Sequence, residues 1–272
     1  MTPTKTTTIK RKRPWRSLPC PGCGAKKTTR EISYGYPASP ADDGKYANGG
    51  CCPLLDQAEI SCVACEWRGS KEDIRIFAAP PVVLTARFLE AMNYANAQHA
   101  GQIRKGTNIA YISHPFGVAG LIIEAGGDED QAIGGLLHDV AEECGGEPRL
   151  REIKKKFGSR VEAIVRGCSD WLGAKEEKKA PWKIRKAEHL ERLGRANGDI
   201  LLVTAADKTH NARAIVTDLD LIGPVLWDRF NATAKDIVWY YESVYDLLRA
   251  REVTSILLSP LSMAIDAMKQ YL

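Results

Sequence analysis

Apolar and polar positions follow a helical spacing through most of the chain after residue 80. Apolar residues recur every three or four positions, as they do when one face of a helix packs on a core. Gly158 ends one of these segments and is a natural helix stop. We expect helices over residues 82–102, 116–125, 128–143, 149–157, 161–171, 182–193, 200–215, 232–250 and 253–271. The pattern predicts a mainly α-helical domain.

The first 80 residues have a different pattern. Residues 28–34 and 58–62 carry β-forming side chains and predict short strands, whereas residues 35–50 are rich in Gly, Pro, Ala and Asp and predict a loop. The run Ala78-Ala79-Pro80-Pro81 predicts a linker. The sequence therefore predicts three parts: a basic flexible tail (1–17), a small β-rich module (18–78) and a helical domain (82–272).

Composition narrows the class of protein. The chain has 272 residues, of which 44% are hydrophobic and 26% are charged. These fractions are typical of globular proteins, and the length suffices for one large core and a small module. No apolar run approaches the length of a membrane span, and the first ten residues lack the apolar core of a secretory signal. We therefore expect a cytoplasmic protein without a membrane partner, in which cysteines are reduced or metal-bound.

Positive charge is concentrated near the start of the chain. Residues 1–80 contain 13 Lys and Arg against 8 Asp and Glu, so the formal net charge of +4 arises there. A short basic stretch with one aromatic residue contributes much of it: Lys10-Arg11-Lys12-Arg13-Pro14-Trp15-Arg16. Such a tail could contact nucleic acid, or it could be a disordered arm that aids solubility.

Two C-x₂-C pairs mark the small module: Cys20, Cys23, Cys62 and Cys65. Each spacing lets two thiolates face one tetrahedral ion, so the pairs predict a structural four-cysteine Zn²⁺ site of the zinc-ribbon type. A module of this size cannot form a large core, and the metal would supply much of its folding free energy. The alternatives are free thiols or a redox pair. The adjacent Cys51 and Cys52 could replace a ligand.

Four side chains of the helical domain could bind a second metal ion. His138 and Asp139 are adjacent, and two neighbours reach one cation only near a helix end or where other helices crowd in. His114 precedes Pro115 and would lie at the mouth of the next helix. Asp207 follows an apolar run, where a carboxylate needs a partner or a metal. The set suits Mn²⁺, Fe²⁺ or Zn²⁺ better than Ca²⁺.

Single members of this set also have simpler explanations. His114 could be an ordinary residue at a helix N-terminus, and Asp207 could be a buried salt-bridge partner. Together the four residues require four coincidences under that interpretation. The other histidines carry no further ligand pattern. We expect His99 and His210 to be structural or to support the ligands, and His189, in a charged helix, to be exposed.

The motifs that contain these residues match a known family. They are residues 98–107, Ser113-His114-Pro115, residues 136–143 and Ala206-Asp207-Lys208-Thr209-His210-Asn211. Their order and spacing resemble the HD-type hydrolase domain of the RelA/SpoT proteins. They are closer still to the stand-alone small alarmone hydrolases, a group that includes the metazoan SpoT homologue. The resemblance covers residues 82–250, most of the chain.

The resemblance implies an all-helical HD domain that holds one Mn²⁺ and removes the 3′-pyrophosphate of guanosine tetra- or pentaphosphate. By position, the metal ligands would be His114, His138, Asp139 and Asp207. The family's acidic pair, which acts on the attacking water, corresponds to Glu142 and Glu143. The second residue of that pair is Asp in the family, so the carboxylate of Glu143 reaches one methylene further. The alternative for the pair is a solvated helix end.

The resemblance also implies contacts with the nucleotide substrate. Arg104 matches an arginine of the nucleotide pocket, Lys105 would contact phosphate, and Asn211 matches an asparagine that contacts the nucleotide. Ala214 stands where the family often has a hydroxyl residue, so base or ribose contacts can differ. The alternative for Arg104 and Lys105 is an ordinary basic surface loop.

Three functions fit these motifs. The first is the alarmone hydrolase. The second is an HD phosphohydrolase that acts on another nucleotide, such as NADPH, or on pyrophosphorylated tRNA 3′ ends, with the small module and basic tail binding the tRNA. The third is a nucleotide-sensing binding module without catalysis. The sequence leaves the oligomeric state and the partner of the zinc module open.

Overall fold

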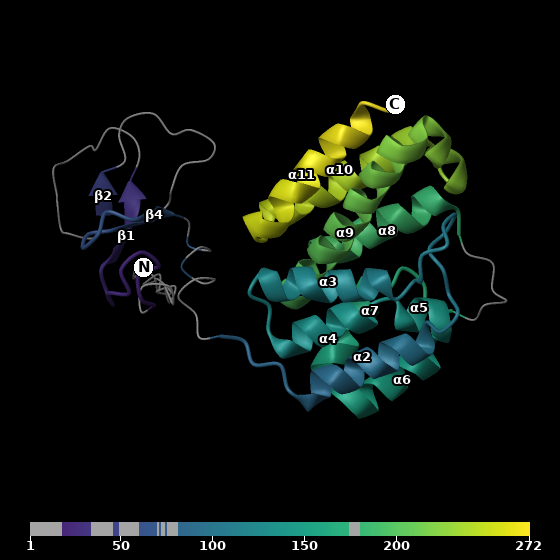
Figure 1. Cartoon of the computed structure of the whole chain (residues 1–272), viewed down its shortest axis with the longest axis horizontal. Helices are drawn as coiled ribbons and strands as arrows, with labels where there is room; N and C mark the ends of the chain where they lie inside the picture. The colour runs from purple at the N-terminus through teal and green to yellow at the C-terminus, as the bar shows by residue number, and fades with distance from the viewer. Residues whose placement is uncertain are drawn as a thin grey trace, which may run out of the picture. The chain divides into compact units, whose positions relative to one another are not determined.

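A computed structural model of the chain describes residues 18–33, 46–48, 60–69, 71, 74, 81–173 and 180–272. The chain divides into two compact units, and the boundary between them is the peptide bond from Pro81 to Val82 (Figure 1). The predicted basic tail, the paired Cys51 and Cys52 and most of the predicted loop at 35–50 lie outside the described residues. In the described part, no helix has both the length and the apolar character that crossing a membrane requires.

The first unit is built on a small sheet. Its strands are β1 (Thr29–Ser33), β2 (Tyr46–Asn48), β3 (Ile60–Cys62) and β4 (Arg68–Gly69), in the order β2-β1-β3-β4. β3 is antiparallel to both its neighbours, and β2 runs parallel to β1. Only Ile60 and Ile74 are fully buried apolar residues among those described here, with Leu18 and Trp67 packed against them. Such a core supplies little burial free energy.

The second unit is all-helical, so the predicted mainly α architecture with a small β-rich module in front is confirmed. Its elements are α2 (Ala86–Gln98), α3 (Ser113–Glu124), α4 (Glu129–Leu137), α5 (Val140–Cys144), α6 (Gly146–Phe157), α7 (Ser159–Cys168), α8 (Trp182–Gly194), α9 (Gly198–Ile222), the 3₁₀ helix η2 (Gly223–Arg229), α10 (Ala234–Ala250) and α11 (Ser255–Lys269).

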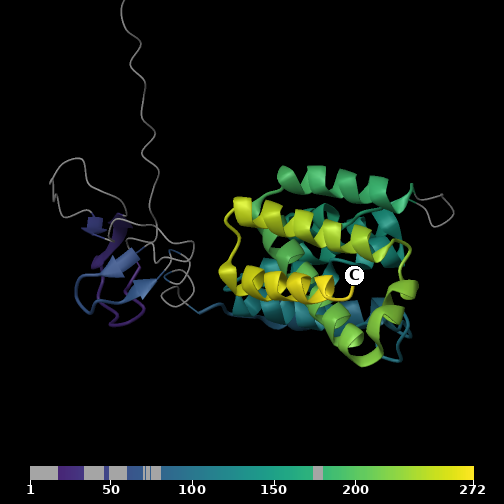
Figure 2. The ribbon, with the colours of Figure 1, turned by 90° about the horizontal axis from the view of Figure 1, so that it is seen from above.

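The long helix α9 is the centre of this unit. It packs against α3, α4, α7, α10 and α11, and α10 and α11 lie side by side on one face of the domain (Figures 1 and 2). Asn197 begins α9, because its side chain accepts a hydrogen bond from the backbone N–H of Ile200. At its other end the helix runs well beyond the predicted end at residue 215, to Ile222. Its middle carries the motif around Asp207 into the interior.

Several predicted boundaries were wrong. The first helix begins at Ala86 rather than 82, because Thr85 caps it. α3 begins at Ser113, so His114 lies in its first turn rather than in front of it. Three residues of the predicted loop, Tyr46–Asn48, form β2, and β4 was not predicted. These changes lengthen or shift elements but keep their order.

The predicted single helix over 128–143 is two helices. α4 follows Asp128, which caps it in a capping box with Gln131, and it ends at Leu137, whereas α5 begins after Asp139. Two glycines let α4 approach its neighbours closely. A Cβ at Gly134 would lie 2.6 Å from Ile164 Cγ2, and one at Gly135 would lie 2.4 Å from Ile122 Cδ1. This close packing against α7 and α3 fixes the end of α4 deep in the domain.

Candidate active site

Four donor atoms converge in the helical domain. His138 Nε2 lies 3.1 Å from Asp139 Oδ2 and 3.7 Å from Asp207 Oδ1. His114 Nε2 lies 3.2 Å from His138 Nε2, 3.2 Å from Asp207 Oδ1 and 3.5 Å from Asp139 Oδ2. Two ligands bound to one ion at about 2.1 Å are about 3.0–3.4 Å apart at octahedral or tetrahedral angles. The spacing and the nitrogen/oxygen chemistry of His114, His138 and Asp139 fit one divalent cation, and Asp207 Oδ1 lies beside the two imidazoles.

Each donor is delivered by a helix end or a buried helix face. His138 is the residue that follows α4 and Asp139 is the residue before α5, so the helix break lets adjacent side chains face one point. His114 comes from the first turn of α3, and Asp207 comes from the middle of α9. Three of the four are buried, and Asp139 is the most exposed with a side chain 26% accessible.

Hydrogen bonds orient both imidazole rings with Nε2 toward the shared point. His138 Nδ1 lies 2.8 Å from the carbonyl oxygen of Gly135 and therefore donates to it. His114 Nδ1 lies 3.0 Å from Nδ1 of His210. Histidines that bind metals almost always use the second ring nitrogen in this way, which fixes the tautomer. The prediction that His210 supports the ligands remains a prediction, but its position is the one such a residue would occupy.

The two carboxylates accept further hydrogen bonds. The Tyr111 hydroxyl donates to Asp139 Oδ2 at 2.5 Å. Lys208 Nζ donates to Asp207 Oδ2 at 2.6 Å, and Asn211 Nδ2 donates to Asp207 Oδ1 at 2.6 Å. Burial alone would raise the pKa of Asp207, but the charge of Lys208 and the two imidazoles lower it well below its ordinary value. Asp207 is therefore ionised, as a metal ligand must be.

A cavity of about 310 Å³ opens beside these donors. Glu142 and Glu143 line it from α5, one turn beyond Asp139. The backbone N–H of Asp170 donates to Glu142 Oε2 at 2.9 Å, whereas Glu143 is exposed. The cavity is also lined by the predicted substrate residues Arg104, Lys105 and Asn211. All nine residues predicted for this site, namely the four metal ligands, the two glutamates and the three substrate residues, thus lie in or at the edge of one site.

Four residues of this cavity were not predicted as site residues: Tyr111, Asp170, Lys186 and Lys208. Lys186, from α8, forms an ion pair with Asp170, and burial together with the charge of Lys208 lowers the pKa of Lys186. Burial alone would lower the pKa of Lys208, but the charge of Asp207 raises it well above its ordinary value. Lys208 belongs to the motif around Asp207, and Tyr111 lies three residues before His114, so both could have been found from the sequence. Asp170 and Lys186 carry no spacing signal.

The prediction that His189 is exposed was wrong. Its side chain is 2% exposed, and its Nδ1 lies 3.0 Å from the hydroxyl of Tyr240. Burial, with the nearby charge of Lys208, lowers the pKa of His189 to about 4. The ring is therefore neutral at pH 7 and is part of the wall behind Asp170.

A second cavity, of about 290 Å³, adjoins the first. Arg104, Lys105 and Asn211 line both, so the two cavities adjoin at these residues. Arg104 Nη2 donates to Asn211 Oδ1 at 3.1 Å, while its Nη1 is buried with no hydrogen-bond partner among the described residues. An unpartnered buried guanidinium N–H is costly, and a ligand anion would satisfy it. The remaining wall is largely apolar, with Tyr241 and Phe230 among its side chains.

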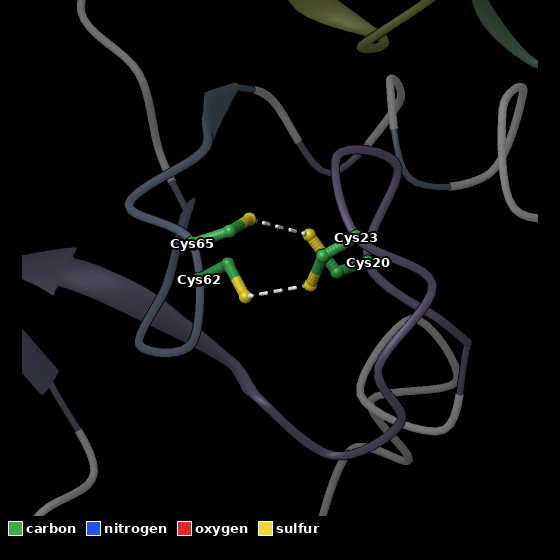
Figure 3. A group of neighbouring side chains, drawn as sticks. All are labelled: Cys20, Cys23, Cys62 and Cys65. Carbon is green, nitrogen blue, oxygen red and sulfur yellow. Dashed lines mark hydrogen bonds between the residues drawn. The ribbon is translucent and has the colours of Figure 1, made fainter.

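The four predicted cysteines of the first unit also converge (Figure 3). Cys20 Sγ lies 3.7 Å from Cys65 Sγ, and Cys23 Sγ lies 3.9 Å from Cys62 Sγ. Sulfurs bound to one tetrahedral Zn²⁺ at about 2.3 Å are about 3.8 Å apart. The cluster fits a tetrahedral metal site and favours the zinc-ribbon interpretation of the module over a redox pair.

The two halves of the cluster repeat one backbone pattern. Gly22 N donates to Cys20 Sγ at 3.3 Å, and Ala64 N donates to Cys62 Sγ at 3.4 Å. The residue after each second cysteine has positive φ, with +72° at Gly24 and +58° at Glu66. These turns direct pairs of sulfurs toward one point, as metal-binding knuckles do.

The electrostatics of the cysteine cluster favour the binding of a cation. Burial alone would raise the pKa of the Cys62 thiol, but hydrogen bonds with the Thr28 hydroxyl and the Ala64 amide lower it to about 6. A hydrogen bond with the Trp67 backbone would lower the pKa of Cys65, yet burial and the neighbouring thiols raise it to about 12. Four thiolates cannot accumulate this closely without a positive charge between them.

Comparisons with known proteins identify relatives of the helical domain. A family model described as "HD domain" matches residues 91–222. The guanosine-3′,5′-bis(diphosphate) 3′-pyrophosphohydrolase MESH1 of Danio rerio is 30% identical over 161 residues, which are 58% of this chain and 80% of that protein. Its counterpart in Xenopus tropicalis is 34% identical over 145 residues, or 52% of this chain and 74% of that protein.

A solved structure of a metazoan SpoT orthologue, which hydrolyses ppGpp, has the same fold. It aligns with a TM-score of 0.54 at 24% sequence identity, and the alignment covers 68% of this chain and 97% of that one. The helical domain, its His-Asp motif and the extent of the match to these relatives lead to one assignment. The chain belongs to the HD-domain family of guanosine-3′,5′-bis(diphosphate) 3′-pyrophosphohydrolases.

Proposed function

We propose that this protein hydrolyses the 3′-pyrophosphate of guanosine tetra- or pentaphosphate and releases pyrophosphate with GDP or GTP. The observation that carries the proposal is the meeting of four metal-type donors with two acidic and several basic side chains in one cavity. The relatives named above act on this substrate by name. A pure nucleotide sensor would need the basic residues but would have no use for Glu142 and Glu143 beside a metal site.

His114, His138, Asp139 and Asp207 would hold the catalytic cation. We propose Mn²⁺, because the two carboxylates suit this hard cation, which also accepts imidazole ligands, and because four protein ligands leave coordination positions open on a six-coordinate ion. A divalent cation here would supply Lewis acidity, which lowers the pKa of water and polarises a phosphoryl oxygen. In the first unit, the tetrahedral sulfur cluster would hold a structural Zn²⁺.

Glu142 and Glu143 would manage protons during the attack on phosphorus. The hydrogen bond from the Asp170 amide holds Glu142 in place, while Glu143 lies on the open side of the cavity. A carboxylate next to the attacking water takes its proton, and the same group or its neighbour can return a proton to the leaving oxygen. We assign to Glu143 the role of accepting the proton of the attacking water, and to Glu142 the role of positioning that water.

The basic residues would bind the phosphates. Lys186 and Lys208 lie on the metal side of the cavity, and Arg104 and Lys105 lie where it joins the second cavity. Fixed positive charges stabilise the negative charge that builds up on the phosphoryl oxygens in the transition state. The unpartnered Nη1 of Arg104 offers a charge-assisted hydrogen bond of this kind. The nucleoside would then occupy the second cavity, beside Asn211 and Ala214.

The direct test is to incubate the metal-loaded full-length protein with guanosine tetraphosphate and to follow pyrophosphate and GDP. The metal-free protein should be inactive, and adding Mn²⁺, Mg²⁺ or Zn²⁺ separately should rank the metals, with Mn²⁺ first. Asp139→Ala serves as the matched inactive variant. Recovery of intact substrate with every metal would refute the proposal. Hydrolysis of NADPH or of a tRNA 3′-end pyrophosphate at a higher kcat/KM would redirect it to that substrate.

A further inference from the structure

An ion pair lies in the wall of the second cavity, away from the metal donors. Arg229 Nη1 and Asp218 Oδ2 are 3.3 Å apart, and their side chains are 27% and 32% exposed. Both residues line the second cavity but not the first. The surrounding wall includes the apolar side chains Ile215, Leu226 and Phe230. A charged pair in a mostly apolar ligand pocket is the kind of group that sets orientation and specificity.

The position of the pair along α9 places it at the far end of the nucleotide. Asp207, Asn211, Ala214 and Asp218 follow one another at helical spacing, so they lie along one face of α9. At 1.5 Å per residue, Asp218 lies about 16 Å beyond Asp207 along the helix axis. If the pyrophosphate is at the metal and the sugar is near Asn211, the base is the part of the substrate that reaches Asp218.

The loop after Arg104 holds Arg229 in place. A Cβ at Gly106 would lie 2.5 Å from Arg229 Cδ and 2.6 Å from its Nε, so any larger residue at this position would displace the Arg229 side chain. Gly106 also has a φ of +74°, which favours glycine. The guanidinium is therefore fixed between the loop and Asp218. It has five N–H donors, and the pair with Asp218 leaves others available.

The pair matches the Watson–Crick edge of guanine. That edge presents the O6 acceptor next to the N1–H and N2–H₂ donors, whereas adenine presents a donor at N6 and an acceptor at N1. A guanidinium donates only, and an ionised carboxylate accepts only. Arg229 therefore complements O6, and Asp218 complements N1–H and N2–H₂. With adenine, both would face a group of their own kind, which leaves polar groups unpaired.

We propose that the Asp218–Arg229 pair reads the purine base and selects guanine over adenine. The inference rests on the proposed function for the orientation of the nucleotide, and it assigns base choice to two residues outside the metal cavity. A bidentate contact of this type discriminates by about 1–3 kcal/mol, or about 5- to 150-fold in affinity.

The test measures the affinity of the full-length protein for GDP, ADP and xanthosine diphosphate. The wild type should bind GDP at least about fivefold more tightly than ADP. In Asp218→Asn, the amide N–H₂ faces N2–H₂ of guanine but complements the O2 of xanthine. That variant should lose most of the preference for GDP and should gain affinity for xanthosine diphosphate. Equal affinities in the wild type, an unchanged GDP/ADP ratio in Asp218→Asn, or no nucleotide binding would each overturn the proposal.

Asp220→Asn is the matched control. Asp220 is exposed on the same helix and accepts a hydrogen bond from the Tyr271 hydroxyl, and it does not line the cavity. It should keep the wild-type ratio. Arg229→Met separates the two contacts, because inosine diphosphate has O6 and N1–H but lacks the amino group. Loss of the Arg229 contact should therefore appear mainly as a lower ratio of the affinity for inosine diphosphate to the affinity for ADP. If the pair only stabilises the fold, Asp218→Asn lowers the thermal midpoint without changing any base ratio, which also refutes the proposal.

Binding and hydrolysis report on separate claims. Selective GDP binding that depends on Asp218, without hydrolysis of guanosine tetraphosphate, would refute the proposed function and keep the base-reading pair. Hydrolysis of guanosine and adenosine substrates at equal kcat/KM, with no effect of Asp218→Asn, would keep the proposed function and refute the pair.

Discussion

The Nδ1 atoms of His114 and His210 lie 3.0 Å apart, so one ring donates a hydrogen bond to the other. If His114 Nε2 is to bind a cation, its Nδ1 must carry the proton and His210 must accept it. We expect His210→Ala to weaken Mn²⁺ binding by about 10- to 100-fold, the usual cost of losing such a support. Calorimetric titration of metal-free protein with Mn²⁺ measures this directly, independently of activity. Unchanged affinity would show that His210 is not required.

A substitution that leaves His210 intact should have the same effect. A Cβ at Gly117 would lie 2.2 Å from Nε2 of His210, so Gly117→Ala must push that ring away from His114. Gly120 lies on the same helix, and a Cβ there would meet nothing within 4 Å. We therefore expect Gly117→Ala to weaken Mn²⁺ binding and Gly120→Ala to leave it unchanged. Equal behaviour of the two variants would contradict the role given to His210.

Substitution of the carboxylates of α5 should lower the rate of hydrolysis and leave the affinity for the metal ion unchanged. Glu143→Gln removes the proposed proton acceptor but adds no bulk, and kcat should fall by about 10²- to 10⁴-fold. Mn²⁺ affinity should stay within about twofold, because the ligands proposed for the ion are other side chains. The measurement pairs steady-state hydrolysis of guanosine tetraphosphate with metal titration.

Two further variants complete that prediction. Glu143→Asp shortens the side chain to the residue typical of the family, and it should keep most of the activity because a carboxylate remains. Glu124→Gln, at the exposed end of α3, should behave as wild type. If Glu143→Gln retains full kcat, the attacking water is activated by another group, and Glu142 becomes the residue to test.

Helical spacing predicted where the elements are better than where they end. All nine helices expected after residue 80 have a counterpart, because a buried stripe recurs whatever caps the helix. The break between α4 and α5 was missed. The break falls at His138 and Asp139, so neither Pro nor Gly marks it in the sequence. Both residues also keep right-handed helical backbone angles. It follows from how α4 is packed by its neighbours, which a single segment of sequence does not contain.

The site shows the same division. His114, His138, Asp139 and Asp207 could be predicted, because each breaks a local rule by placing a polar group in an apolar context. Asp170 and Lys186 could not, because each is one of many charged residues and only the fold brings them to the cavity. The burial of His189 was missed for the same reason. Its helix is charged in sequence, but that turn faces Tyr240.

The cysteine cluster should control the folding of the first unit. The small apolar core among its described residues leaves metal binding as the main source of stability. We expect Cys62→Ser to lose the bound Zn²⁺ and to make residues 18–78 sensitive to protease, while the helical domain from residue 82 stays resistant. Cys144→Ser, outside the cluster, is the control and should keep its zinc. Elemental analysis and limited proteolysis measure both. A protease-resistant first unit without zinc would contradict a structural role.

His189 should make the protein less stable as the pH is lowered through a defined window. Its pKa is about 4 in the folded protein, against an ordinary value of about 6.5, because burial opposes the charged form. Between these values the unfolded chain binds the proton and the folded protein does not, so the stability contributed above pH 6.5 is lost as pH falls toward 4. From pH 7 to pH 5 the loss is about 2 kcal/mol. Chemical denaturation at both values measures it, and His189→Gln should remove that part of the pH dependence. If the variant and the wild type lose equal stability, His189 is not the group that titrates.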